Sequence, residues 1–357
     1  MRWIFLINDM IGFISHNCIY FTAFLCALLL SLLFTPFSIF LGKKLKIMDI
    51  PNERKVHIKA IPRSGGIAVF FSFFIAYLFI EKTYNPFTDN IFLYLFISLF
   101  MIFILGILDD FMDLKAKTKF VFQILIALFY TLNVHCITEI HFPFFNEPIF
   151  LGFLSIPFTV IWIVAITNAF NLIDGLDGLS SGLAAISAFT FFIVSLNLDN
   201  VIVSILAIIL AGTLCGFLFF NSNPAKIFLG DSGSLFIGFL LASISVLELK
   251  QVAVTSFVTP ILIFFIPISD TVYAIIRRKL KGEPIFQADK DHLHHGFLRL
   301  GFSQRKTVLL IYLFTLILSL GAIFSLMVAI NFSILILLVY MVLFQFIARK
   351  IGMFPKK

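Results

Sequence analysis

The sequence predicts an all-α, polytopic integral membrane protein, and two observations carry that prediction. Of the 357 residues, 61% are hydrophobic and only 13% are charged, and the mean hydropathy is +1.07. Soluble domains are nearer half apolar and a quarter charged. The chain also holds about eleven apolar stretches close to the length of about 20 residues that a membrane-spanning helix needs. We therefore expect a single transmembrane domain over residues 1–357.

The expected spans follow one another along the whole chain. They centre near residues 30, 73, 99, 127, 158, 188, 210, 241, 264, 318 and 338. The spans near 73, 127 and 241 are short or interrupted, and the last two are hard to separate, so we expect 10–11 transmembrane helices. The first run begins near Ile19 and lacks a small-residue cleavage site, which indicates a retained span rather than a secretory signal. The four cysteines are far apart, which predicts free thiols.

The net charge of +7 is informative through its distribution. If the first basic loop is cytoplasmic, 23 of the 26 Lys and Arg residues fall on the cytoplasmic side of the alternating spans. The positive-inside rule predicts this asymmetry, with the N-terminus outside and the C-terminus in the cytoplasm. We expect no nucleic-acid partner. The main cytoplasmic loops are then residues 42–65, 109–119, 168–182, 221–234 and 277–306.

The first polar cluster on this side is "LGILDDFMDLKAKTK" (105–119). Asp109 and Asp110 end a span at a helix C-terminus, where the helix dipole disfavours anions. Acids that break a local rule tend to mark functional sites. The alternative is a solvated turn at the membrane exit, balanced by the lysines that follow, among them Lys119.

The second cluster is "NAFNLIDGLDGLSSG" (168–182), which places Asn168, Asn171, Asp174 and Asp177 three residues apart. The first three cover one arc of a helix, and the glycines after them let the backbone turn the last acid back toward the same cavity. Such oxygen-rich groups suit Mg²⁺, and amide side chains can also bind a base or a sugar. A capped helix–loop–helix junction is the alternative.

Two further clusters complete the set. In "FLGDSGSLF", Asp231 lies at the start of an apolar helix, where free N–H groups favour phosphate and an acid can hold a bridging metal; an ordinary helix cap is the alternative. His292, His294 and His295 lie in the most basic loop. Zinc binding is disfavoured because no cysteine or other fourth ligand is near. Histidines beside arginines suit a pyrophosphate better, and surface histidines without a role are the alternative.

All four clusters fall on one side of the predicted membrane topology, which favours phosphoryl chemistry at the cytoplasmic interface. "NAFNLIDGLDGLSSG" and "NPAKIFLGDSGSLFIGF" in combination resemble the polyprenyl-phosphate N-acetylhexosamine-1-phosphate transferase family, glycosyltransferase family 4, with its MraY and WecA/TagO branches. The resemblance extends from about residue 47 to residue 306. Asp113 and "HLHHG" depart from the MraY pattern and favour the WecA/TagO branch.

The resemblance implies roles for individual residues. Asp231 would hold the metal, with Asn171 as a second ligand. Asp109 and Asp110 would form an essential acidic pair, one member of which positions or deprotonates the lipid phosphate. The residues that would bind substrate or act on the phosphates are Asp174, Asp177 on the uridine side, Asn221, Lys59, Lys119 and the H-x-H-H motif of His292, His294 and His295.

The implied reaction transfers N-acetylhexosamine-1-phosphate, by default GlcNAc-1-phosphate, from a UDP-sugar to undecaprenyl phosphate and releases UMP. It would require Mg²⁺ or Mn²⁺. The expected place is the cytoplasmic face of a bacterial inner membrane, at the start of O-antigen, common-antigen or teichoic-acid synthesis, and a homodimer is left open.

Two other classes compete with this interpretation. An ion-coupled transporter would also carry membrane carboxylates, but its site is expected near the bilayer midplane and often in a repeated half. A CDP-alcohol phosphotransferase would need a D-G-x2-A-R-x8-G-x3-D-x3-D motif, which is absent.

Overall fold

The computed structural model describes residues 2–49, 60–84, 91–140, 147–251, 257–284, 292–327 and 330–351. The helices are α1 (Arg2–Lys44), α2 (Gly65–Tyr84), α3 (Ile91–Met112), α4 (Ala116–Asn133), α5 (Ser155–Leu172), α6 (Leu179–Asn197), α7 (Val201–Asn221), α8 (Gly230–Gln251), α9 (Val258–Ile263), α10 (Phe265–Lys281), α11 (Leu293–Arg299), α12 (Gln304–Phe324) and α13 (Ile330–Lys350). In these ranges the remaining regular structure is the 3-10 turn η1 (Gly152–Leu154) and two short antiparallel pairs, β1 (Met48–Asp49) with β2 (Ile61–Pro62) and β3 (Glu139–Ile140) with β4 (Ile149–Phe150). The all-α prediction is confirmed, and the four cysteines are free.

Nine of the described helices are long and apolar enough to cross a membrane, which is fewer than the expected 10–11. These helices are α1, α2, α3, α5, α6, α7, α8, α12 and α13. The two expected spans that do not qualify are present in another form. Helix α4, near residue 127, carries Lys117 and Lys119 in its first turn, and the span near 264 is divided at Phe264 into α9 and α10.

Helix α4 and the pair of α9 and α10 make contacts at different levels along the bundle. Lys119 at the start of α4 contacts the end of α3, whereas Tyr130 near the other end of α4 bonds to Ser243 far along α8. With 18 residues, α4 is about 27 Å long, close to the hydrocarbon thickness. At one end of the divided span, Thr259 of α9 contacts Ser325 just after α12, and farther along, Asp270 of α10 contacts His292 and Leu293 at the start of α11.

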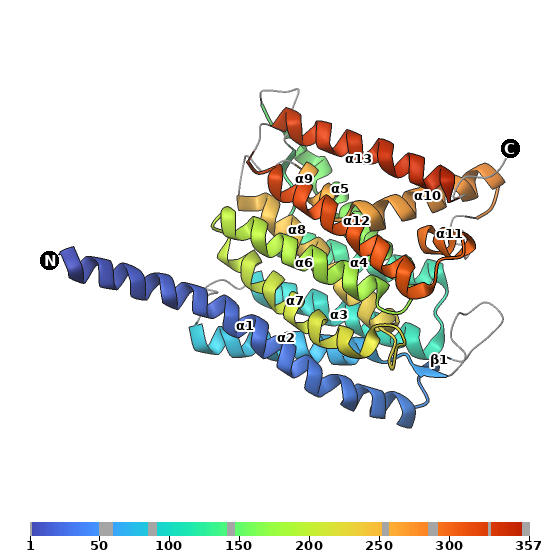
Figure 1. Cartoon of the computed structure of the whole chain (residues 1–357), viewed down its shortest axis with the longest axis horizontal. Helices are drawn as coiled ribbons and strands as arrows, with labels where there is room; N and C mark the ends of the chain where they lie inside the picture. Colours follow the sequence, from blue (N-terminus) through green and yellow to red (C-terminus); the bar gives the residue numbers. More distant parts are fainter. Residues whose placement is uncertain are drawn as a thin grey trace.

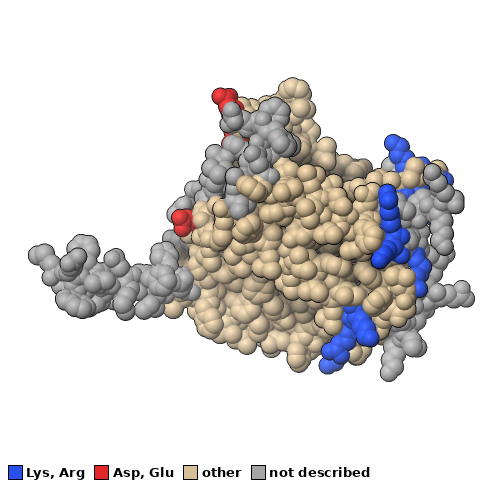
Figure 2. All heavy atoms as spheres, turned by 45° about the horizontal axis from the view of Figure 1, so that its top comes forward, with Lys and Arg blue, Asp and Glu red and all other residues tan. Residues whose placement is uncertain are grey.

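The bundle therefore has two distinct ends. The helices run side by side, and the two chain ends lie at opposite ends of the molecule (Figure 1). The described parts of all five loops expected in the cytoplasm lie at the end that carries the C-terminus. Figure 2 shows Lys and Arg side chains gathered at this end of the visible face and the few Asp and Glu side chains at the other. This charge distribution agrees with the predicted orientation, whose assignment to the cytoplasm stays a prediction.

Helix α8 forms the centre of the bundle. Within its span, 94% of the residues are buried, against 22% for α1 and 17% for α13, which face outward. Helices α2, α3, α5, α6 and α7 all pack against α8. A helix that is apolar on every side is stable in such a central position because each face meets another helix. The first residues of α8 include Asp231, Ser232 and Ser234, and this polar start of the helix contributes side chains to the site.

Candidate active site

The end of α3 is tied to the beginning of α8 by a carboxylate. Asp110 accepts hydrogen bonds from the backbone N–H groups of Asp231 (2.7 Å) and Ser232 (2.9 Å), two of the N–H groups that a helix start leaves without partners. The close approach needs Gly230, because a Cβ atom there would lie 2.8 Å from Asp110 Oδ2, and its φ of 73° is costly for other residues. Asp110 therefore fixes the direction in which α8 presents its first acid.

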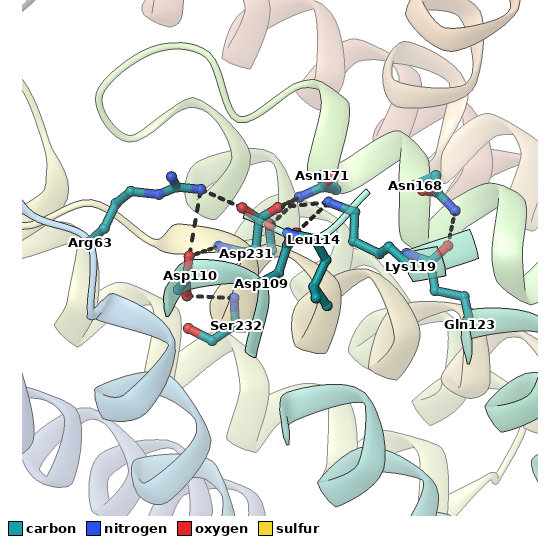
Figure 3. A network of polar contacts seen from close by, with 11 residues as sticks. Arg63, Asp109, Asp110, Leu114, Lys119, Gln123, Asn168, Asn171, Asp231 and Ser232 are labelled. Carbon is teal, nitrogen blue, oxygen red and sulfur yellow. Dashed lines mark hydrogen bonds and ion pairs between the residues drawn. The ribbon is translucent and has the colours of Figure 1, made fainter. Parts of the chain in front are cut away.

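Asp231 is surrounded by cations and an amide from three other segments (Figure 3). One carboxylate oxygen accepts from Asn171 Nδ2 (2.6 Å) and from Lys119 Nζ (3.2 Å), and the other accepts from Arg63. The two cations also contact the acidic pair: Lys119 lies 2.7 Å from Asp109, and Arg63 lies 3.5 Å from Asp110. Three acids and two bases thus form one network around the start of α8.

A cavity of about 370 Å³ opens beside this network. Its lining consists of Asp49, Arg63, Asn171, Asp174, Gly175, Leu176, Asp177, Asn221, Phe228, Leu229, Gly230, Asp231, Ser234, His295 and Gln304. Four carboxylates therefore line it together with the one guanidinium of Arg63. Although burial disfavours its charge, the neighbouring carboxylates of Asp231 and Asp110 raise the pKa of Arg63 above its ordinary value, so it stays a cation. Acids therefore outnumber bases in the described lining, and a cation bound there would favour the entry of a polyanion.

The three histidines of the H-x-H-H motif lie at three different places. His292 Nδ1 donates to Asp270 Oδ2 (2.8 Å) on α10, away from the cavity lining. His294 is buried, and its ring packs against Gly175 of the loop between α5 and α6. His295 lines the cavity itself. Burial, together with the charge of His295, lowers the pKa of His294 to about 3, so this imidazole is neutral.

The loop between α5 and α6 carries the two acids that line the cavity opposite α8. One carboxylate oxygen of Asp177 accepts hydrogen bonds from Asn223 Nδ2 (2.9 Å) and from the backbone N–H of Ala225 (3.0 Å). Asp174 faces the other carboxylates. Burial, and after it the charge of Asp231, raises the pKa of Asp174 to about 8.

Comparison with known proteins places this arrangement in a family. The family model described as "Glycosyl transferase family 4" matches residues 92–248, from α3 to α8. Over 336 residues, the chain is 40% identical to the probable undecaprenyl-phosphate N-acetylglucosaminyl 1-phosphate transferase of Bacillus subtilis (strain 168), covering 94% of this chain and 93% of that one. The chain belongs to glycosyl transferase family 4. The resemblance inferred from the two motifs is thereby confirmed.

Other family 4 relatives match over most of their length. The decaprenyl-phosphate N-acetylglucosaminephosphotransferase of Mycobacterium tuberculosis (strain ATCC 25618 / H37Rv) is 33% identical over 311 residues, which cover 79% of this chain and 76% of that one. The phospho-N-acetylmuramoyl-pentapeptide-transferase of Staphylococcus epidermidis (strain ATCC 12228 / FDA PCI 1200) is 34% identical over 307 residues, covering 79% and 91%. The chain is therefore similar to proteins named for different sugars.

Several residues predicted from the family 4 motifs come together at the cavity. Those in its lining are Asn171, Asp174, Asp177, Asn221, Asp231 and His295. Asn221 is also part of the frame, because it donates to the carbonyl of Ile227 and accepts from Ser181. Asp109 and Lys119 lie behind Asp231 rather than in the lining. Lys59 lies outside the described residues.

Two expectations need correction. The helix start at Asp231 was expected to offer free N–H groups to phosphate, but Asp110 accepts from the N–H groups of residues 231 and 232. The arc that was expected to bring Asn168 into the same cavity does not do so. The amide of Asn168 donates to Gln123 on α4 (2.6 Å; Figure 3) and to the carbonyl of Val164. One helical turn separates Asn168 from Asn171, and only the latter lies at the level of the cavity.

The sequence reasoning overlooked two charged residues of the site. Arg63 stands in "KAIPRSGG" (59–66), and its place just after a two-residue strand carries no periodic signal. Asp270 could have been noticed as an acid inside the otherwise apolar run "FIPISDTVYAII". Both residues are identified only by the partners that they contact, which come from distant parts of the chain.

The raised pKa of Asp174 leads to a prediction for stability. An acid with a higher pKa in the folded chain binds more protons when folded. The free energy of unfolding therefore falls as the pH rises from 3.8, the ordinary pKa of aspartate, toward about 8. We expect Asp174→Asn to raise Tm by a few degrees at about pH 9 and by a clearly smaller amount at about pH 5, where only the first part of this pH range has been covered. Thermal unfolding in detergent at both pH values measures this. An equal gain at both pH values would contradict titration of Asp174 as the cause.

Proposed function

We propose that this chain transfers N-acetylglucosamine-1-phosphate from UDP-GlcNAc to undecaprenyl phosphate and releases UMP. The single observation that carries the proposal is the cavity at one end of a membrane bundle, with Asp231 held between Arg63, Lys119 and Asn171. Two anions must meet in this reaction, and these residues supply the charges that position them. The relatives named for N-acetylglucosamine support the choice of sugar.

The chemistry exchanges one phosphoanhydride for another. An oxygen of the lipid phosphate attacks the β-phosphorus of the donor and forms a new P–O bond. The bond between the β-phosphorus and the bridging oxygen breaks, and the electron pair leaves with UMP. Arg63 and Lys119 would lower the repulsion between the two phosphates, and Asp177, which lines the cavity, would face the nucleotide.

The donor set also suits a divalent cation. Mg²⁺ is usually bound through one or two carboxylates and shares the phosphates of its substrate. Asp231 with Asn171 would hold it, and the excess of carboxylates in the cavity lining favours a cation there. When bound, Mg²⁺ or Mn²⁺ would neutralise charge on the phosphates in the transition state. Among the described residues, no group of three or more His, Cys, Asp and Glu side chains is arranged to hold a metal, so substrate oxygens would complete the coordination.

The acceptor fits the position of the site. The cavity lies at the end of the bundle, where a lipid phosphate would lie at the membrane surface while its chain stays in the bilayer. A second cavity of about 210 Å³, lined by apolar side chains and Tyr340, lies between α10, α12 and α13 and touches Leu293, the residue between His292 and His294. Its lining suits an isoprenoid chain. The charge distribution of the two ends supports a cytoplasmic site in a bacterial inner membrane.

The test is transfer by the purified protein in detergent with undecaprenyl phosphate, Mg²⁺ and a panel of labelled UDP-sugars that includes UDP-GlcNAc, UDP-GalNAc and UDP-MurNAc-pentapeptide. We expect metal-dependent labelling of the lipid from UDP-GlcNAc together with release of UMP. Labelling from the pentapeptide donor instead would contradict the proposed branch. Failure of every donor, while the Bacillus subtilis relative works in the same assay, would contradict the proposed reaction.

A further inference from the structure

The loop with Asp174 and Asp177 is connected to α10 through a chain of three contacts. The first is made by Asp270, a buried acid with 1% of its surface exposed. Its two oxygens accept from His292 Nδ1 (2.8 Å) and from the backbone N–H of Leu293 (2.7 Å). A buried carboxylate with two such bonds is expensive to replace, because each donor would lose its partner. Asp270 thus anchors the beginning of α11 to α10.

The second contact joins His292 to His294, and the third joins His294 to Gly175 of the loop. The rings of His292 and His294 are parallel, with an interplanar angle of 1° and centroids 5.8 Å apart. His294 then packs on Gly175, where an added Cβ atom would lie only 2.4 Å from His294 Nε2. Gly175 is the neighbour of Asp174, so the ring of His294 supports the backbone that carries this acid.

His294 makes no hydrogen bond that would hold it there by itself. Both of its ring nitrogens are buried and without a partner in the described structure. Leaving such groups unsatisfied is unfavourable, so the position of the ring must be imposed by what holds α11. Asp270 is the buried residue that supplies this hold through two hydrogen bonds at the N-terminal end of a helix of only seven residues.

We propose that Asp270 is a positioning residue, which acts through His292 and His294 to set the loop of residues 173–178 against the cavity. Asp270 itself lies outside the cavity lining. The effect of replacing Asp270 on the enzyme kinetics rests on the proposed function, since the loop would bind the nucleotide part of the donor. The effect of the replacement on the structure of the loop does not depend on that function.

The structural consequence is measured by hydrogen exchange of the amides of residues 173–178 in the purified protein. We expect Asp270→Ala to accelerate exchange in this loop severalfold. Asp270→Asn should give a smaller effect, because one of the two acceptor oxygens remains; it also serves as the test if the alanine variant does not fold. The matched control is Glu248→Gln, which alters another buried acid that accepts from Ser195 and Asn200. Unchanged exchange in both Asp270 variants would overturn the proposal.

The kinetic consequence is measured on the same variants. We expect Asp270→Ala to raise KM for the UDP-sugar about tenfold and KM for the lipid by a smaller factor, because Leu293, which loses its bond to Asp270, only borders the apolar cavity. The double variant Asp270→Ala/His292→Ala should be no worse than the more impaired single variant, because both break one connection. An equal rise in KM for both substrates, or additive effects of the two substitutions in the double variant, would overturn the positioning role of Asp270. If the wild type itself neither binds nor uses UDP-sugars, the proposed function fails, and hydrogen exchange alone decides this inference.

Discussion

Asp231→Asn is expected to lower sugar-phosphate transfer by at least about a thousandfold, the largest effect of any single substitution in the site. The amide keeps the shape of the side chain but carries no charge. It can neither balance Arg63 and Lys119 nor hold a cation beside the phosphates. Initial rates with labelled donor and undecaprenyl phosphate measure the loss, and thermal unfolding shows whether the variant is folded.

The matched control for this experiment is Asp113→Asn. Asp113 lies at the same end of the bundle, is exposed, and has a φ of 46°, a conformation that asparagine also tolerates. Its replacement should leave transfer within about twofold of the wild-type rate, as expected for a surface substitution. If Asp231→Asn kept a tenth or more of the wild-type rate, Asp231 could not be at the reacting centre.

Asp110→Ala is expected to lower both activity and stability. The substitution removes the acceptor for the N–H groups of Asp231 and Ser232, and loss of a helix cap costs about 1 kcal/mol. It also frees the start of α8 to shift, and a displacement of about 1 Å at a reacting group can cost about a hundredfold in rate. Rates and Tm measured on the same preparation test both effects.

Asp110→Asn separates this capping role from a role as general base. Asparagine keeps one acceptor oxygen, so we expect its rate and its Tm to fall between those of the wild type and the alanine variant. A general base would give a different pattern in the rate alone. The asparagine variant would then be as inactive as the alanine variant, although its Tm would still fall between the two, because one of the two acceptor oxygens remains.

The membrane class, the expected helical segments and the clustering of acids at one end could all be inferred from the sequence. Hydropathy is a local property, since each span must be apolar over its own length whatever its neighbours are. The motifs around Asn171, Asp177 and Asp231 are also local. Their spacing places each residue at the end of a span on the same side, where the structure brings the side chains to one cavity. Span counting was less secure, because the first turn of α4 is polar and the span of α9 and α10 is divided.

Only the tertiary structure decided which polar groups meet. Asp109 and Asp110 are adjacent in sequence, yet one contacts Lys119 and the other caps α8. His292 and His295 are three residues apart, yet one is anchored to α10 and the other lines the cavity. Such partners depend on how the helices are rotated and packed against one another. No hydropathy pattern or spacing along a single segment records that rotation, because it is set by contacts between segments far apart in the chain.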